Sequence, residues 1–268
     1  MPNSTAYIVG ILNVTPDSFS DGGEHLSIDA ALAHARRMRD EGADIIDIGG
    51  ESSRPGSEPV PEDEELRRVI PVIEALAKEG FPLPLSIDTY KPRVAREALA
   101  AGASIVNDIT GLGSPEMRAA AAAARQVILM HMQGEPKTMQ ADPAYGDVVS
   151  DIRDFFRARI ALAKEAGITD IVLDPGLGFG KTLEHNLAIL RRLGEFADLG
   201  FPILVGVSRK AFIGALTEGA PADDRLEGTI AAVVVARMNG ASYFRVHDVR
   251  ACRRALQVAD ALAAAPVS

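Results

Sequence analysis

The sequence predicts an α/β protein with the (β/α)8 TIM-barrel fold, organised as a single domain that spans residues 1–268. Eight short β-branched runs alternate with amphipathic stretches, and these runs are apolar nearly throughout, as parallel strands covered on both faces are. No low-complexity linker divides the chain, and its length is typical of eight strand–helix units. A doubly wound open sheet is the alternative, because periodicity does not distinguish a closed sheet from an open one.

The predicted strands are runs rich in Ile, Val and Leu, and the helices fill the amphipathic stretches between them. In chain order, the expected strands are Tyr7–Leu12, Ile45–Ile48, Leu85–Ile87, Ile105–Asn107, Val127–Met130, Ile171–Asp174, Ile203–Val207 and Tyr243–Val246. The expected helices are Asp29–Glu41, Asp63–Lys78, Pro92–Ala100, Pro115–Arg125, Asp147–Ala166, Leu183–Leu193, Gly228–Met238 and Val249–Ala264. Several of these helices end at a glycine before the next strand, where a left-handed cap turns the chain back toward the sheet.

Composition and charge exclude several functional classes. The chain has 28 basic and 37 acidic residues, whereas a protein that binds the nucleic-acid backbone would carry a basic face. Its single cysteine, Cys252, allows neither an internal disulfide nor a Cys-x-x-Cys zinc site, which suits the cytoplasm. The start of the chain has no secretory pattern, and the longest apolar run, Ile230–Ala236, is too short to span a bilayer. We therefore expect a cytoplasmic protein without nucleic-acid or membrane partners.

Polar residues follow every one of the predicted strands. In a (β/α)8 barrel the chemistry lies at the carboxyl ends of the strands, so these residues are expected to meet in one site. Each also has an ordinary structural explanation: Asp174 fits a turn, His131 fits a buried core position, and Asp88 fits a helix cap. In strand order, the set is Asn13, Asp47, Asp88, Asn107, Asp108, His131, Asp174, Ser208–Lys210, Arg245 and His247.

Two phosphate-binding motifs are approached but not matched. The segment at 176–182 suggests a Walker loop, but Pro175 stands where that motif needs glycine. Lys181 likewise stands where the dinucleotide fingerprint needs its last glycine. The chain also contains neither His-Glu-x-x-His nor Gly-x-Ser-x-Gly, so a zinc protease or a serine hydrolase has no support.

Four of the strand-end residues suit a flat heterocycle. Asp88, Asn107 and Asp174 supply carboxylate and amide groups that pair with an exocyclic amine and with ring N–H groups. Arg245 can lay its planar guanidinium over the ring face, which a lysine cannot do. These residue types predict a heterocycle held at its edge and covered on one face.

The cationic residues suit a phosphate. Arg54, His247 and Lys210 would bind the phosphate oxygens, and the side-chain oxygen of Asn13 suits a hard cation such as Mg²⁺. Carboxylates deep in the site, next to cations that bind a phosphate, indicate a reaction in which a phosphate-bearing group leaves. Its departure creates positive charge on the heterocycle, which the carboxylates stabilise.

Two long segments stand out at the first two strand ends: ILNVTPDSFSDGG at 11–23 and DIGGESSRPG at 47–56. Shorter segments continue the series: SIDTY at 86–90, NDITG at 107–111, MHMQG at 130–134, DPGLGFGK at 174–181, SRK at 208–210 and RVH at 245–247. Together and in this order, they closely resemble the signatures of the dihydropteroate synthase family. The resemblance extends over nearly the whole chain.

The resemblance implies a (β/α)8 barrel enzyme, a transferase of folate and tetrahydrofolate biosynthesis that is a sulfonamide target. Such an enzyme condenses 6-hydroxymethyl-7,8-dihydropterin diphosphate with p-aminobenzoate to give 7,8-dihydropteroate and pyrophosphate. We expect a dissociative substitution assisted by Mg²⁺, in which the diphosphate leaves before the neutral arylamine attacks. The resemblance also implies a homodimer.

Carried over position by position, the resemblance implies roles for individual residues. The residues expected to take part in the reaction are Arg54, Asp88, Asp174 and Lys210. The pterin diphosphate is expected to contact Ser53, Asp88, Asn107, Asp174, Lys210, Arg245, Val246 and His247. p-Aminobenzoate is expected to contact Ser53, Arg54, Pro55 and Phe179, and the expected metal ligand is Asn13.

Two other functions stay open. A methyltetrahydrofolate-dependent methyltransferase barrel would share the pterin-facing residues but release no pyrophosphate, which leaves the Ser-Arg-Pro-Gly, Ser-Arg-Lys and Arg-x-His segments unexplained. A non-catalytic pterin-binding paralogue would have lost the first two loops, and both are present. Ser53 replaces the usual threonine of the family and Ala211 replaces its common Ser or Arg, so we expect altered affinity rather than a different reaction.

Overall fold

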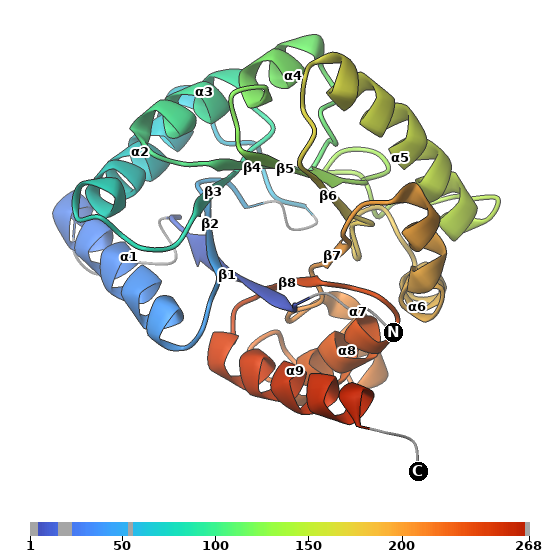
Figure 1. The fold of residues 1–268 in the computed structure, drawn as a ribbon. Coiled ribbons are helices and arrows are strands. Elements are labelled where there is room, and N and C mark those ends of the chain that lie inside the picture. The colour runs from blue at the N-terminus through green and yellow to red at the C-terminus, as the bar shows by residue number, and fades with distance from the viewer. Residues whose placement is uncertain (1–4, 16–22, 53–55, 266–268) are drawn as a thin grey trace.

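The computed structural model describes residues 5–15, 23–52 and 56–265 and has the predicted (β/α)8 fold (Figure 1). Within these residues, eight parallel strands form one sheet in the order β6-β5-β4-β3-β2-β1-β8-β7. The strands are β1 (Tyr7–Asn13), β2 (Ile45–Gly49), β3 (Leu85–Asp88), β4 (Ile105–Asp108), β5 (Gln126–Met130), β6 (Ile171–Asp174), β7 (Leu204–Val205) and β8 (Tyr243–Val246).

The outer strands of this order, β6 and β7, meet and close the sheet. Leu173 of β6 forms a parallel bridge with Ile203, and its N–H donates to the Pro202 carbonyl at 2.9 Å. The closed barrel is therefore confirmed, and the open doubly wound sheet is excluded.

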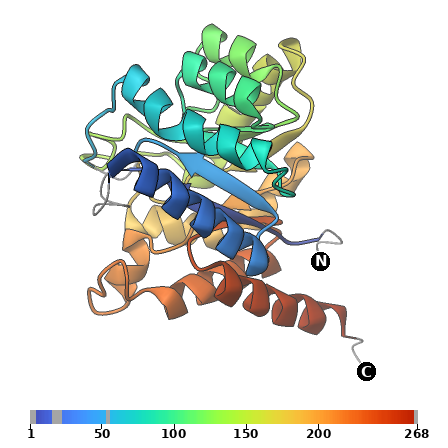
Figure 2. The ribbon, with the colours of Figure 1, turned by 90° about the vertical axis from the view of Figure 1, so that its left-hand side faces the viewer.

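Helices surround the strands on the outside of the barrel, as the side view shows (Figure 2). They are α1 (Gly23–Asp40), α2 (Glu62–Lys78), α3 (Pro92–Ala101), α4 (Pro115–Ala121), α5 (Val148–Glu165), α6 (Leu183–Arg191), the 3-10 helix η2 (Leu193–Leu199), α7 (Ala211–Leu216), α8 (Leu226–Met238) and α9 (Val249–Ala264). Ser114 and Asp147 cap α4 and α5 by accepting a backbone N–H with their side chains. No helix in the described part of the chain has the length and hydropathy needed to span a bilayer.

A few elements differ from the prediction. β7 is shorter than Ile203–Val207, because the chain already turns at Val207, whose carbonyl accepts from the Lys210 N–H. α4 ends before Arg125, because the N–H of Arg125 instead donates to the Ser104 carbonyl beside the sheet. In addition, α1 begins earlier than predicted, and α7 is absent from the predicted elements.

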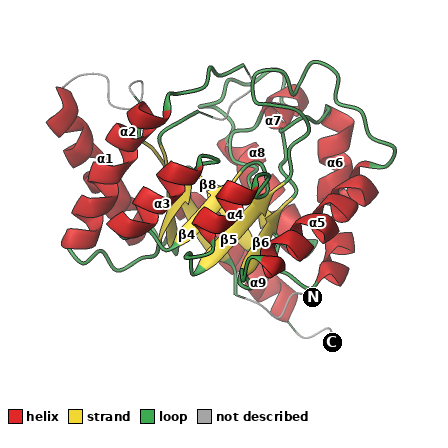
Figure 3. Ribbon diagram, turned by 90° about the horizontal axis from the view of Figure 1, so that it is seen from above, coloured by secondary structure: helices red, strands yellow, loops and turns green. Residues whose placement is uncertain are grey.

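A small apolar cluster fills the barrel near the amino ends of the strands. It consists of Val9, Ile45, Ile105, Ile128, Val172, Leu204 and Tyr243. A larger cluster packs between the outer face of the strands and the helices. Because successive strand residues face opposite sides, the residue two positions after each inner-cluster member also faces the barrel interior, nearer the carboxyl end. The long loops gather at one end of the barrel, where α7 also lies (Figure 3).

Candidate active site

Polar side chains line the barrel directly above the inner apolar cluster. Asp47 follows Ile45 of that cluster by two positions, and Asn107 follows Ile105 in the same way, so both face the interior. The register of β3 and β4 places Asp88 beside Asn107. The polar layer contains Asp47, Ser86, Asp88, Asn107, Asp174 and Arg245.

Arg245 lies between two carboxylates from neighbouring strands. Its Nε donates to Oδ2 of Asp47 at 2.6 Å, and its Nη2 donates to Oδ2 of Asp88, also at 2.6 Å. The Nδ2 group of Asn107 donates to the same Asp47 oxygen at 3.0 Å. The structure thus brings Asp88, Asn107 and Arg245 into one hydrogen-bonded group at the barrel mouth.

Two carboxyl groups of this site, those of Asp88 and Asp174, have raised pKa values. Burial raises the pKa of Asp88 to about 7, against the lowering effect of Arg245 and with a further rise from Asp47. Burial also raises the pKa of Asp174 to about 6, against the lowering effects of a backbone N–H, Lys210 and Arg245. For Arg245, burial lowers the pKa, but the surrounding carboxylates outweigh burial and the net pKa is raised. The site therefore holds a permanent cation beside two buried acids, Asp88 and Asp174, whose pKa values are raised toward neutrality.

Asp174 both stabilises the turn after β6 and places its carboxyl group in the site. Its Oδ1 accepts the Gly176 N–H at 2.8 Å, which is the side-chain turn that an Asp in this position favours. Its side chain is buried, and Lys210 and Arg245 act on its charge. The turn therefore holds the carboxyl inside the site.

Phe179 and Lys210 form a second part of the mouth. Nζ of Lys210 lies 4.1 Å from the centroid of the Phe179 ring, a cation–π contact. Phe179 is buried in a small apolar cluster with Ile109, Met130 and Met139. This combination offers an aromatic wall beside a cation, which suits an aromatic ring that carries a carboxylate.

His247 is held by the loop after β7. Its Nδ1 lies 3.0 Å from Oγ of Ser208, and its backbone N–H donates to the same oxygen at 3.2 Å. The side chain of the preceding residue, Val246, is buried in the outer apolar cluster, between strands and helices. Of these two predicted residues, only His247 has a side chain that belongs to the mouth.

Gly206 directly follows β7 and carries no side chain. Gly206 follows the inner-cluster residue Leu204 by two positions and so faces the interior. A Cβ atom at Gly206 would meet no heavy atom within 4 Å. A side chain at this position would therefore meet open space. A separate hollow of about 340 Å³ lies between α3 and α4, but apart from Arg96 its lining is Leu and Ala, so it offers no catalytic chemistry.

Asn13 ends β1, pairs in register with Gly49 and is partly exposed. Across residues 5–15, 23–52 and 56–265, no group of three His, Cys, Asp or Glu side chains could hold a metal. Mg²⁺ commonly takes one or two protein oxygens and completes its shell with water and substrate phosphates. The Asn13 side chain therefore fits a Mg²⁺ ion that arrives with a diphosphate, rather than one held by the protein alone.

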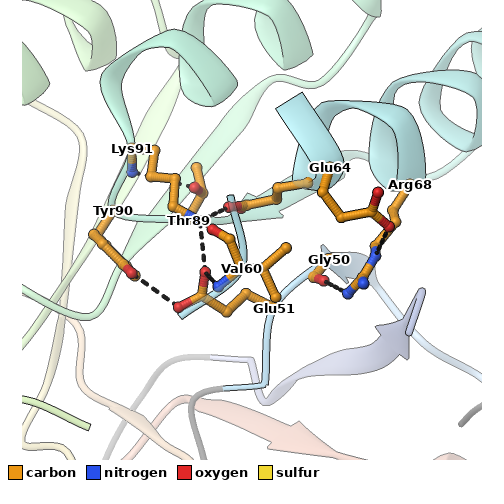
Figure 4. A network of polar contacts seen from close by, with 9 residues as sticks. Gly50, Glu51, Val60, Glu64, Arg68, Thr89, Tyr90 and Lys91 are labelled. Carbon is orange, nitrogen blue, oxygen red and sulfur yellow. Dashed lines mark hydrogen bonds and ion pairs between the residues drawn. The ribbon is translucent and has the colours of Figure 1, made fainter. Parts of the chain in front are cut away.

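The predicted residues Ser53, Arg54 and Pro55 lie outside the described residues. The chain on either side of them is held by a network of buried charges (Figure 4). Nζ of Lys91 donates to Oε2 of Glu51 at 2.5 Å and to the Val60 carbonyl at 2.7 Å, and it also pairs with Glu65.

Tyr90 and Glu51 complete this network. The Tyr90 hydroxyl donates to Oε1 of Glu51 at 2.8 Å, and the Val60 N–H donates to Oε2 of Glu51 at 3.1 Å. A small cavity of about 10 Å³ is lined by Glu51, Glu65 and Tyr90 of this network and also by Asp88. The network therefore fixes both ends of the segment that contains residues 53–55 against the start of α3.

Asp47 is one of the strand-end residues, but the sequence alone predicts no role for it. The sequence feature that could have indicated its role is a charged residue inside an otherwise apolar strand, two positions after the inward-facing Ile45. The pairing of Lys181 with His131, at 3.0 Å between Nζ and Nδ1, was also missed. That pairing has no sequence signal, because it joins loops that follow different strands.

A closed barrel of parallel strands with ionisable side chains packed at its mouth defines a (β/α)8 barrel enzyme. Residues 9–247 match the family of pterin binding enzymes. The dihydropteroate synthase of Escherichia coli (strain K12) is 50% identical over 261 residues, which cover 96% of this chain and 92% of the relative. The dihydropteroate synthase of Bacillus subtilis (strain 168) is 48% identical and covers 95% and 88% of the two chains.

Solved structures agree with these relatives. The Yersinia pestis dihydropteroate synthase with a sulfonamide drug complex has a TM-score of 0.92 and 48% identity, covering 99% of this chain and 97% of the other. The Burkholderia cenocepacia dihydropteroate synthase complexed with 7,8-dihydropteroate has a TM-score of 0.88 and 46% identity, covering 98% and 93%. The chain belongs to the pterin binding enzymes and, among them, to the transferase family of the dihydropteroate synthases.

Proposed function

We propose that this chain condenses 6-hydroxymethyl-7,8-dihydropterin diphosphate with p-aminobenzoate to give 7,8-dihydropteroate and pyrophosphate. The observation that carries this proposal is the hydrogen-bonded group of Asp88, Asn107 and Arg245 inside the barrel mouth. Relatives have been solved with 4-aminobenzoic acid and with 7,8-dihydropteroate bound, which supports the same two substrates here.

The pterin ring is held at its edge by the deep acceptors. Asp88 and Asp174 accept hydrogen bonds from ring N–H and amino groups, and the side-chain oxygen of Asn107 accepts another. Arg245 covers the ring face with its guanidinium. Because Nε of Arg245 is bound to Asp47, its Nη2 group can leave Asp88 to the pterin without the arginine losing its anchor.

The diphosphate lies at the cationic rim. His247, Arg54 and Lys210 bind its oxygens, and the side chain of Asn13 would hold a Mg²⁺ ion that comes with it. Such an ion would neutralise charge on the departing pyrophosphate. The rim cations stabilise the same charge as the bond to the pterin methylene breaks.

The second substrate needs orientation more than a base. The Phe179 ring and Lys210 provide an aromatic wall and a cation for p-aminobenzoate, and Ser53, Arg54 and Pro55 complete its pocket. The deep carboxylates Asp88 and Asp174 stabilise the cationic methylene that the departing diphosphate leaves behind. The neutral arylamine attacks that carbon, and its surplus proton passes to solvent.

We also propose that the protein is a homodimer of single-domain subunits in the cytoplasm. Exposed apolar side chains on α8 and α9 support the dimer: Val235 is 48% exposed, Met238 45%, Val258 60% and Leu262 71%. These two helices lie side by side on the outside of the barrel (Figure 1). Light scattering on the purified protein tests this, since a monomer at micromolar concentration would contradict it.

The decisive experiment is pyrophosphate release after the two substrates are mixed with Mg²⁺. We expect release in the wild type and loss of turnover in both Asp88→Ala and Arg54→Ala. Normal turnover by both variants would refute the site assignment. Consumption of methyltetrahydrofolate with a corrinoid acceptor would instead indicate the methyltransferase, and pterin binding without turnover would indicate the non-catalytic paralogue.

A further inference from the structure

Asp47 is a fully buried carboxylate inside the barrel. It lies on β2 with 0% of its surface exposed, and its Oδ2 accepts two hydrogen bonds. Arg245 donates the first at 2.6 Å, and Asn107 donates the second at 3.0 Å. Both donors are side chains of the proposed pterin site, so this one oxygen touches two residues of that site.

The bond to Asp47 sets the orientation of the Asn107 amide. An asparagine side chain has a donor end and an acceptor end, and only one of them can face a ligand at a given place. Because its Nδ2 group donates to Asp47, the Asn107 oxygen points away from that carboxylate. Asp47 therefore determines that Asn107 offers an acceptor, not a donor, to a ring N–H group.

The same carboxylate fixes the plane of Arg245. Its guanidinium is bound on one side through Nε to Asp47 and on the other through Nη2 to Asp88. Two contacts on different nitrogen atoms define the plane of a rigid group. If Asp88 is to turn to a ligand, Asp47 is the carboxylate that keeps the guanidinium in place.

Asp108, one of the strand-end residues expected in the site, is instead a structural carboxylate at the same end of the barrel. Its Oδ1 accepts the N–H and hydroxyl groups of Thr110, and its Oδ2 accepts the N–H of Leu112, so both oxygens hold its own loop. Asp47 has no such loop contact, and its Oδ1 lacks a hydrogen-bond partner within the described chain, as does Oγ of its register partner Ser86. Buried polar atoms are normally paired, so this arrangement is costly for the fold alone.

We propose that Asp47 is a positioning residue of the pterin site, which acts through Asn107 and Arg245 and does not itself touch the ring. This inference rests on the proposed function, because it assumes that a pterin is the ligand above these two side chains. Its consequence is that the charge of Asp47, and not only its volume, is needed for pterin affinity.

The first test is the isosteric change Asp47→Asn, with 6-hydroxymethyl-7,8-dihydropterin as the binding probe. Loss of a charged hydrogen-bond acceptor should raise the Kd of the probe by about 10- to 100-fold. The KM for p-aminobenzoate at saturating pterin diphosphate should stay within about threefold of the wild-type value, since Phe179 and Lys210 are untouched.

Asp108→Asn is the matched control, because it removes a buried carboxylate of the same size at the next strand but one. It should lower the melting temperature while the Kd of the probe changes by less than about threefold. A loss of pterin affinity in Asp108→Asn equal to that in Asp47→Asn would assign the effect to general destabilisation and overturn the inference.

A swap of the two groups tests the positioning role directly and also serves if Asp47→Asn does not fold. Asn107→Asp alone places two carboxylates in contact, whereas the double variant Asp47→Asn/Asn107→Asp restores an amide–carboxylate pair with an oxygen still facing the ring. We expect the double variant to bind the probe more tightly than either single variant. If the fold-change in Kd of the double variant equals the product of the fold-changes of the two single variants, the inference is overturned, because independent sites behave in that way.

The two proposals fail differently. If the wild type neither binds the probe nor releases pyrophosphate, the proposed function is wrong. If the wild type does both and Asp47→Asn binds the probe as tightly as the wild type, only the role of Asp47 is wrong.

Discussion

Nζ of Lys181 lies 3.0 Å from Nδ1 of His131, although both side chains are buried. Burial lowers the pKa of Lys181 to about 7, and burial together with Lys181 lowers the pKa of His131 to about 3. Lys181 also donates to the Phe179 carbonyl at 2.9 Å. The pair therefore joins the loop after β5 to the residue that forms the aromatic wall of the site.

Replacing Lys181 by methionine should change how stability depends on pH. The lysine pKa is 10.5 in the unfolded chain and about 7 in the folded one, so the unfolded state binds more protons between these values. The free energy of unfolding of the wild type therefore gains a contribution that rises with pH through this window. From pH 7 to about pH 9, the wild type should gain about 2 kcal/mol relative to Lys181→Met, measured by urea unfolding.

Lys78→Met is the control for this measurement, because Lys78 is exposed on α2. Its stability should follow the wild type at every pH. Parallel pH curves for Lys181→Met and the wild type would contradict a buried lysine with a lowered pKa.

Pterin affinity should increase with pH across neutrality. The pKa values of Asp88 and Asp174, about 7 and about 6 in the free protein, mean that both carboxyls lose their protons in this range. Only the deprotonated carboxyl accepts hydrogen bonds on both oxygens, so the ligand binds that form and its affinity falls as the pH drops below these values. Calorimetric titration with 6-hydroxymethyl-7,8-dihydropterin from about pH 5 to about pH 8 measures this change.

Asp88→Asn should bind more weakly and remove the component of this profile near pH 7, because the amide does not titrate. The titration of the ligand itself is measured separately and subtracted. Equal profiles for the variant and the wild type would show that Asp88 is not the group that titrates.

Lys91→Met should strongly destabilise the protein. Its ammonium group pairs with Glu51 and with the buried Glu65, so the variant leaves both carboxylates without their cation (Figure 4). Breaking a buried ion pair in this way costs about 3–5 kcal/mol. Arg93→Ala, two positions further along in α3, is the control, because its pairs with Asp63 and Glu97 are exposed to solvent and should add little to stability. Chemical denaturation of both variants measures the difference, and equal losses would refute it.

Gly176→Ala should be among the most damaging changes in the loops. A Cβ atom at Gly176 would lie 1.9 Å from the His131 carbonyl oxygen, and the residue has a φ of +66°. The loop after β6 must then move away from the loop after β5, at a cost of about 3–5 kcal/mol.

Gly200→Ala separates the two causes, because Gly200 has a similar φ of +76° but open space around its Cβ position. It should lose only about 1–2 kcal/mol. A thermal melt of each variant suffices, and equal melting temperatures would mean that the close approach to His131 is not limiting.

Much of the fold could be predicted because strand identity is a local property. Tyr243–Val246 is rich in residues that favour strands, and the structure has β8 at these same bounds. The end of a strand is less local: β7 stops at Val205 because of a turn formed by residues further along the chain. The short helix α7 has no capping side chain and therefore no sequence signal.

The site was predictable where each residue carries its own evidence. Asp88 ends β3 and Asn107 lies one residue before the end of β4, and the barrel rule alone gathers such residues at one mouth. Asp47 differs, because its role depends on a partner 198 positions away, Arg245, and on the register that brings β2 near β8. The same holds for Lys91, whose partners Glu51 and Glu65 precede it by 40 and 26 positions.

The junction between β6 and β7 has much less backbone pairing than the junction between β1 and β2. β1 and β2 pair over five residues, whereas β6 and β7 are joined through the bridge of Leu173 and Ile203. Asp174 stands on one side of this junction and Lys210 follows the strand on the other. A substrate that contacts both Asp174 and Lys210 connects the two sides of this weakly paired junction. The ligand-bound protein should therefore resist heat and proteolysis at this junction better than the ligand-free protein.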